Sequence, residues 1–128
     1  MDQRFSKKEK LKSKKQIELL FQEGQSVKGF PLRLLYLESP LPYQEIMVQV
    51  GVSVPKRLHK LAVTRNRIKR LMREAYRLNK NLVDTKGTTF AVLILYTHRE
   101  IPSYEDMDKA MVKLLKRFND EISKTTPA

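Results

Sequence analysis

Every even-numbered position is apolar in two stretches of the chain, residues 30–37 and 46–54, and the second stretch alternates cleanly. A period of two predicts β-strands that turn one face toward a core. Residues 88–97 instead contain the continuous apolar run Phe90–Tyr96, which is typical of a central strand covered on both faces. Pro31 indicates an edge strand or the start of a strand. We expect the first two strands to form an antiparallel, hairpin-like pair.

Three other stretches repeat apolar residues with the 3.6-residue period of amphipathic helices. The first begins after Ser13, a capping residue, and ends before Gly24. The second extends from about Val63 or Arg65 to Lys80, with Thr64 as a candidate N-cap, and the third begins at Ser103. The element order αββαβα predicts the α+β class, as a two-layer sandwich of helices against a small mixed sheet.

Length and composition fit one domain with one hydrophobic core, because the chain has 128 residues of which 41% are hydrophobic. We expect this domain over residues 13–124, after a basic mobile arm at 1–12 and before a tail at 125–128. The absence of cysteine excludes disulfides, thiolate nucleophiles and cysteine-ligated metal centres. No apolar run approaches the roughly 18 residues of a membrane-spanning helix. No apolar segment follows the N-terminal lysines, so a cytoplasmic protein is the default expectation.

Most of the net positive charge lies in residues 56–80, which hold ten Lys or Arg and one acid, Glu74, and so contribute +9 of the formal +12. Such a charge density repels itself and is best tolerated where a polyanion lies against it. At about 100° per residue, the helix separates into two arcs. The apolar arc consists of Ile68, Leu71, Met72, Ala75 and Leu78. The basic arc consists of Arg65, Asn66, Lys69, Arg70, Arg73, Arg77 and Lys80.

This separation favours nucleic acid over an anionic membrane. A membrane-surface helix needs bulky apolar residues open to lipid beside its basic face, whereas the apolar arc here is expected to face the core. A solvated helix face of mixed charge is the plainer interpretation. It predicts paired acids and bases, which Glu74 alone does not supply.

Residues suited to catalysis do not group along the sequence. Glu105 and Asp108 lie at the start of the last helix, where acids suit the helix dipole. His59 and His98 lie in separate connections, and we interpret them as surface or phosphate-contacting residues. Ser53 lies in V-G-V-S-V-P, which differs from the G-x-S-x-G motif of a nucleophile. We therefore expect a binding surface, with no catalytic residue and no metal site in this chain.

The segment T-R-N-R-I-K-R-L-M-R-E-A, Thr64–Ala75, resembles the basic helix of the protein subunit of bacterial ribonuclease P. That family has an R-N-x-x-K-R-x-x-R pattern, which is matched by Arg65, Asn66, Lys69, Arg70 and Arg73. The stretch V-G-V-S-V-P-K-R at Val50–Arg57 also resembles the family. So does the L-K…F-x-x-G pattern of Leu11, Lys12, Phe21 and Gly24. The similarity covers roughly residues 5–122 in element order and spacing.

The resemblance implies a subunit of a ribonucleoprotein endonuclease. In the family, a catalytic RNA hydrolyses precursor tRNA and removes its 5′ leader, and the Mg²⁺ cofactor belongs mainly to that RNA. The implied partners are this RNA and precursor tRNA, without a membrane or a small-molecule cofactor. The implied fold is that of the second domain of ribosomal protein S5. Its βαβ crossover is left-handed, an exception to the usual right-handed rule.

The resemblance also assigns residues to two binding surfaces. The implied contacts to RNA are Lys56, Arg57, Lys60, Arg65, Asn66, Arg67, Lys69, Arg70, Arg73 and Arg77. The implied leader cleft, between the first helix and the sheet, contains Ile17, Phe21, Arg33, Leu35, Gln49 and Ser53. Ile17 and Leu35 stand where the family commonly has an aromatic residue, which predicts less base stacking and weaker leader affinity. For Phe21, core packing and leader contact are equally open.

Other functions stay open on the residues alone. A general RNA-binding protein, ribosomal or an assembly factor, would share the basic helix but would not prefer precursor tRNA over mature tRNA. A stand-alone nuclease would need a cluster of carboxylates for metal ions. A membrane-surface protein would bind anionic vesicles.

Overall fold

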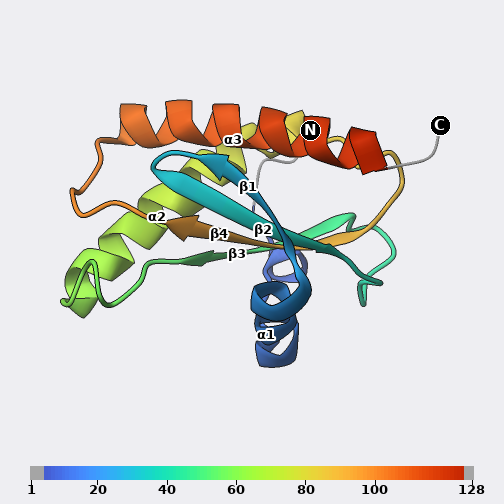
Figure 1. Ribbon diagram of the computed structural model, residues 1–128, viewed down its shortest axis with the longest axis horizontal. Helices are drawn as coiled ribbons and strands as arrows, with labels where there is room; N and C mark the ends of the chain where they lie inside the picture. The colour runs from blue at the N-terminus through green and yellow to red at the C-terminus, as the bar shows by residue number, and fades with distance from the viewer. Residues whose placement is uncertain (1–4, 126–128) are drawn as a thin grey trace.

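A computed structural model describes residues 5–125 and contains a four-stranded sheet with helices on both faces (Figure 1). The strands are β1 (Gln25–Gly29), β2 (Leu32–Glu38), β3 (Val48–Ser53) and β4 (Phe90–Tyr96). The helices are α1 (Lys14–Glu23), α2 (Ala62–Asn79) and α3 (Tyr104–Thr125), with short 3-10 turns at Lys7–Glu9 and Lys80–Leu82. The sheet order is β1-β2-β4-β3, antiparallel except for the parallel pair of β3 and β4. The α+β class with a small mixed sheet is confirmed.

Strand pairing differs from the prediction in two ways. First, β2 and β3 do not pair, because β4 lies between them and bonds to both. Second, the predicted order αββαβα lacks β1, an edge strand whose sequence Q-S-V-K-G has too few apolar residues to reveal a period. Phe30 is not a core residue of a strand: it lies in the turn between β1 and β2, and it is 73% exposed. Pro31 directly precedes β2, which is an interior strand.

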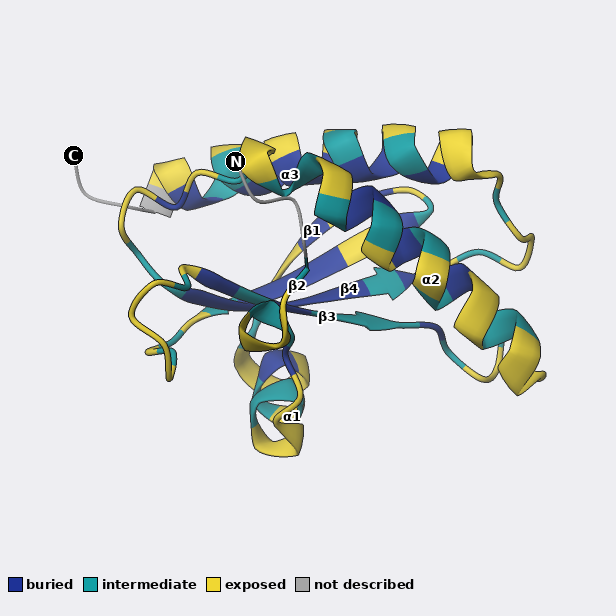
Figure 2. Cartoon of the chain, turned by 180° about the vertical axis from the view of Figure 1, so that it is seen from behind, coloured by how far each residue is buried: buried dark blue, intermediate teal, exposed yellow. Residues whose placement is uncertain are grey.

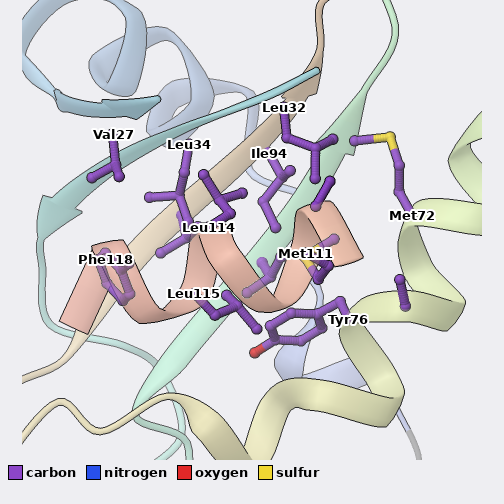
Figure 3. Close-up of a cluster of buried hydrophobic side chains, with 14 of the residues drawn as sticks. Val27, Leu32, Leu34, Met72, Tyr76, Ile94, Met111, Leu114, Leu115 and Phe118 are labelled. Atoms are coloured by element: carbon purple, nitrogen blue, oxygen red, sulfur yellow. The ribbon is translucent and has the colours of Figure 1, made fainter. Parts of the chain in front are cut away.

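The main core lies between the sheet and the layer formed by α2 and α3 (Figure 3). Helix α3 buries the whole apolar stripe that its sequence predicts. This stripe consists of Met107, Met111, Leu114, Leu115, Phe118 and Ile122. Helix α2 buries Ile68, Met72 and Ala75, as predicted, and also Tyr76, which we placed in neither arc. Leu71 is half-buried and Leu78 is exposed, so the buried arc of α2 is narrower than its sequence indicates.

The opposite face of the sheet is covered by α1 (Figure 2). A second cluster is buried there, formed by Leu11, Leu20, Leu35, Ala91 and Leu93. The Ser13 hydroxyl caps α1 as predicted, accepting a bond of 3.3 Å from the Gln16 amide. The helix ends before Gly24, where a Cβ atom would collide with the Leu20 carbonyl oxygen. The predicted two-layer sandwich therefore carries an additional helix on its second face.

Residues 5–12 pack against the domain, whereas the sequence predicts a mobile arm over residues 1–12. The Leu11 amide donates to the Val50 carbonyl at 3.1 Å, and the Phe5 ring meets Tyr76 edge-on at 5.3 Å between centroids. The Glu9 carboxylate and the Lys80 ammonium form an ion pair of 2.9 Å that is largely buried. The prediction of an arm is therefore wrong for this part, while residues 1–4 lie outside the described residues.

The Glu9–Lys80 pair makes the stability of this segment depend on pH. Burial alone would raise the pKa of the Glu9 carboxyl, but hydrogen bonds from Lys80 and Ser6 outweigh burial and lower this pKa from 4.5. We expect Glu9→Gln to lower the free energy of unfolding by about 1 kcal/mol at neutral pH. Because the pKa is depressed in the folded state, this contribution is complete above pH 4.5 and is lost as pH falls through the folded pKa.

Urea unfolding at neutral pH and at a pH of about 3 measures this effect. The difference between wild type and Glu9→Gln should shrink at the lower pH, because protonation of the Glu9 carboxyl removes the charged pair. The matched control is Glu18→Gln, on the exposed side of α1, which should change stability little at either pH. If Glu9→Gln lowered the free energy of unfolding by the same amount at both pH values, a contribution from the charged pair would be contradicted.

Candidate nucleic-acid interface

Basic residues occupy the outer side of α2 and the connection that precedes it, where Figure 2 shows much of the chain as exposed. The connection holds Lys56, Arg57 and Lys60, all exposed. On α2, Asn66, Arg67, Arg70 and Arg73 are exposed and Lys69 is half-buried. We call these eight residues the basic surface. It is held by a rigid support, because the opposite side of α2 is packed into the main core.

Two hollows lie along this surface. One is lined by Val63, Asn66, Arg67 and Arg70, at the beginning of α2. The other lies between α2 and the N-terminal segment, and it is lined by Phe5, Ser6, Lys7, Lys10, Arg70, Arg73, Glu74 and Arg77. Arg70 borders both hollows. Their cationic linings suit phosphate groups, to which a guanidinium can donate two parallel hydrogen bonds.

The beginning of α2 is fixed by side chains that we expected to contact RNA or solvent. The predicted N-cap, Thr64, is wrong: Leu61 holds that position and has no capping side-chain bond. Instead Arg65 reaches back, and its Nη1 donates to the carbonyl oxygens of His59 and Lys60 at 2.9 and 2.8 Å. The His59 side chain is buried, not at the surface, with Nε2 2.7 Å from the His98 carbonyl oxygen. Arg65 and His59 thus position the basic connection.

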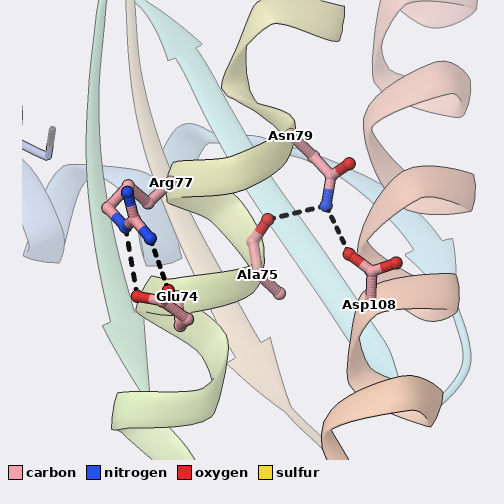
Figure 4. Close-up of polar contacts among 5 residues, drawn as sticks. All are labelled: Glu74, Ala75, Arg77, Asn79 and Asp108. Atoms are coloured by element: carbon pink, nitrogen blue, oxygen red, sulfur yellow. Dashed lines mark hydrogen bonds and ion pairs between the residues drawn. The ribbon is translucent and has the colours of Figure 1, made fainter. Parts of the chain in front are cut away.

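The last turn of α2 is partly neutralised. Arg77 donates to the Glu74 carboxylate through Nε at 3.1 Å and through Nη2 at 2.5 Å (Figure 4). The hydrogen bond from Arg77 lowers the pKa of the Glu74 carboxyl, and Glu74 raises the pKa of Arg77. Lys80 is engaged by Glu9. The predicted basic arc is therefore more weakly cationic here, and Arg77 contributes less to it than its sequence position implies.

A second candidate surface lies on the face of the sheet that α1 covers in part. Strand register aligns Lys28 with Arg33, Arg33 with Leu95, and Leu95 with Ser53. We call these four residues the sheet row. Lys28 and Arg33 are exposed, and Leu95 and Ser53 are half-buried. The Arg33 Nε donates to the Ser26 hydroxyl at 2.9 Å, which holds this guanidinium over β1.

Phe21 lies on α1, which covers part of the sheet face that holds the sheet row. The Gln16 side chain bonds to Ser39, beyond the end of β2. At about 100° per residue, Phe21 lies roughly 140° around α1 from Gln16 and therefore projects from a different side of the helix. Phe21 is 60% exposed, which favours a surface contact over core packing.

Three residues predicted for the leader cleft have other surroundings. Leu35 is only 7% exposed, in the cluster beneath α1, so the prediction of an accessible Leu35 is wrong. Ile17 packs against the same cluster and is half-buried. The Gln49 Nε2 donates to the Lys8 carbonyl oxygen at 3.0 Å and so anchors the N-terminal segment. Of the predicted set, Phe21, Arg33 and Ser53 are placed on the same side of the sheet with accessible surface.

Sequence reasoning missed the contribution of residues 5–10 to the basic surface. Lys7 and Lys10 line the second hollow beside Arg70 and Arg73. The signal was Leu11, an apolar residue that lies among four lysines within residues 7–12 and anchors the segment to Val50. Among residues 5–125, no helix is long and apolar enough to span a membrane, and no three His, Asp or Glu side chains gather as a metal site.

A comparison with protein families identifies the chain: the family model for ribonuclease P matches residues 5–119. The chain belongs to the ribonuclease P protein family. The ribonuclease P protein component of Porphyromonas gingivalis is 35% identical over 121 residues, covering 89% of this chain and 85% of that protein. The protein component of Chlorobaculum tepidum is 38% identical over 120 residues, covering 84% of this chain and 77% of that protein.

Solved structures agree on the fold. The ribonuclease P protein of Thermotoga maritima superimposes with a TM-score of 0.68 at 24% identity, covering 85% of this chain and 96% of that chain. The ribonuclease P protein of Staphylococcus aureus superimposes with a TM-score of 0.67 at 21% identity, covering 84% of this chain and 93% of that chain. The ribonuclease P family motif thus lies on α2, where four of its five matched residues contribute to the basic surface and Arg65 secures the helix start.

Proposed function

We propose that this chain is the protein subunit of ribonuclease P, which binds the catalytic RNA and the 5′ leader of precursor tRNA. It assists the Mg²⁺-dependent endonucleolytic cut that removes the leader and generates the mature 5′ end. The observation that carries the proposal is the family match over residues 5–119, together with the exposure of the motif residues Asn66, Arg70 and Arg73 on one side of α2.

The basic surface is proposed to bind the catalytic RNA. Arg67, Arg70 and Arg73 are exposed and can each donate two parallel hydrogen bonds to a phosphate. Asn66 offers an amide that can bond to a phosphate or to a ribose 2′-hydroxyl. We assign hydrolysis, and the Mg²⁺ that serves it, to the RNA subunit. The role of this chain is then to bind and orient RNA.

The sheet row and Phe21 are proposed to bind the leader. Arg33 and Lys28 are exposed cations that suit its phosphates, and the exposed ring of Phe21 suits an unpaired base. Because stacking on an aromatic ring is tolerant of sequence, such a surface can serve the differing leaders of many tRNAs.

Reconstitution with a bacterial ribonuclease P RNA tests the proposal. We expect the purified chain to cut nothing alone, and to stimulate cleavage of precursor tRNA by that RNA at low Mg²⁺ concentration. We also expect the assembled enzyme to bind precursor tRNA more tightly than mature tRNA. Failure to stimulate cleavage would refute the proposal. Binding without stimulation, and without preference for the leader, would identify a general RNA-binding protein.

A further inference from the structure

Phe30 is a large aromatic side chain at the end of the sheet that neither core contains. It occupies the turn between β1 and β2 and is 73% exposed, more than Phe21. Single exposed apolar residues are common on protein surfaces and need no function. Phe30 differs because its surroundings hold it firmly in place and carry the charges that a nucleic acid would require.

The turn is fixed from the strand beside it. Thr97 donates two hydrogen bonds to the Pro31 carbonyl oxygen, one from its amide at 2.8 Å and one from its hydroxyl at 2.9 Å. The next residue, His98, meets the Phe30 ring edge-on, with ring centroids 5.1 Å apart and planes at 63°. The His98 carbonyl oxygen is in turn bonded to the buried His59 ring. Phe30 is therefore presented by a pre-organised support, which reduces the entropy lost when it binds a ligand.

Phe30 lies close in sequence to two residues of the sheet row, Lys28 on β1 and Arg33 on β2. Along β2, on the face covered by α1, Leu35 lies beneath the helix, Arg33 follows in the open, and the turn with Phe30 comes next. Arg33 is thus the first exposed residue of β2 after that turn. The β1–β2 turn, the β4–α3 connection and the beginning of α2 lie at the same end of the sheet in both views (Figures 1 and 2). Exposed Lys28 and Arg99 supply further positive charge there.

We propose that Phe30, supported by His98, stacks an unpaired nucleobase of the single-stranded RNA that crosses the sheet row. The inference rests on the proposed function, because it requires the leader to lie on this face. Exposed aromatic rings that alternate with cations suit a chain in which bases alternate with phosphates. Phe21 and Phe30 would then each hold a base of the strand whose phosphates Arg33 contacts. The buried Leu35 and the half-buried Ile17 cannot provide such a ring.

A tryptophan introduced by Phe30→Trp gives a direct measurement, because the chain has no tryptophan of its own. The variant is assembled with ribonuclease P RNA, and its fluorescence is followed as precursor tRNA or mature tRNA is added. Stacking predicts quenching by precursor tRNA and little change with mature tRNA. The matched control is Tyr43→Trp, an aromatic position 40% exposed in the connection between β2 and β3. Its fluorescence should not respond to the leader.

Affinity separates stacking from simple apolar contact. In the assembled enzyme, we expect Phe30→Ala and Phe30→Leu each to weaken binding of precursor tRNA by about tenfold, with binding of mature tRNA unchanged. Phe30→Trp should retain wild-type affinity. Thermal unfolding of each variant checks that the fold is intact, and little change is expected because the side chain is exposed.

The outcomes distinguish the two proposals. If wild type prefers precursor tRNA, but the fluorescence of Phe30→Trp is not quenched or Phe30→Leu binds like wild type, Phe30 does not stack a base and only this inference fails. If wild type neither stimulates cleavage nor prefers the leader, the proposed function fails and the inference fails with it. Quenching in Phe30→Trp together with loss of affinity in Phe30→Leu supports both.

Discussion

Replacing Arg70 and Arg73 together with alanine is expected to weaken binding to ribonuclease P RNA by about 100-fold, roughly tenfold for each lost phosphate contact. Both side chains are exposed on α2, one helical turn apart, and Arg70 borders both hollows of the basic surface. Each phosphate contact releases counterions when it forms. The slope of the logarithm of affinity against the logarithm of salt concentration should therefore fall by about two units.

A salt titration of RNA binding measures this slope for wild type and for the double variant. The matched control is Lys113→Ala with Lys116→Ala, which removes the same charge from the outer side of α3. If the interface lies on α2, the control should keep nearly the wild-type slope. An unchanged slope in the Arg70/Arg73 variant would rule out phosphate contact by these two residues. If RNA affinity and the salt slope fell equally in both double variants, RNA would be attracted to the positively charged protein in general and not to α2.

The basic surface could be predicted from sequence because its residues are local. Arg67, Arg70 and Arg73 recur at helical spacing, and the apolar residues between them determine which side of α2 is buried. The contributions of Lys7 and Lys10 could not be predicted in this way. They reach the second hollow through contacts distant in sequence, such as Leu11 with Val50, for which the local pattern gives no signal.

Charge counting also overestimated the end of α2. Glu74 follows Arg73 in the sequence, but its carboxylate accepts hydrogen bonds from Arg77, three residues on. Lys80 pairs with Glu9, which is 71 residues away along the chain. The i, i+3 spacing of Glu74 and Arg77 on one helix makes their pairing readable from the sequence. A helical period gives no such signal for Lys80, whose acid comes from a distant segment.

The leader surface was harder to predict because strand phase distinguishes only two faces. Leu35 and Arg33 share a face, and the period of two treats them alike. The structure separates them, since α1 lies across the position of Leu35 and leaves Arg33 open. Which part of a face a helix covers depends on the contacts that orient it, here including the bond between Gln16 and Ser39. The missed strand β1 has a similar cause, because its pairing with β2 specifies it more than its own sequence does.

Phe118→Ala is expected to be the most destabilising of the substitutions considered, and to lower the free energy of unfolding by about 3–5 kcal/mol. The ring is 1% exposed on α3, and it meets Tyr36 and Phe90 edge-on at centroid distances of 5.2 and 5.7 Å. Those two rings also meet each other, at 5.9 Å. Removing the Phe118 ring opens a cavity in the main core and breaks two of the three edge-on ring contacts in this group. Domains of this size are stable by only about 5–15 kcal/mol, so this one substitution removes a large share of the total.

Urea unfolding of three variants separates the causes. Phe118→Leu retains most of the side-chain volume but loses the ring contacts, and should lower the free energy of unfolding by about 1–2 kcal/mol. Phe21→Ala removes the same side chain from an exposed position and should cost less than about 0.5 kcal/mol, while it weakens leader binding. The two phenylalanines are thus expected to have opposite effects, because one supports the fold and the other serves the surface. A loss below about 1 kcal/mol for Phe118→Ala would contradict the packing of α3 on the sheet, since cavities of this kind cost far more.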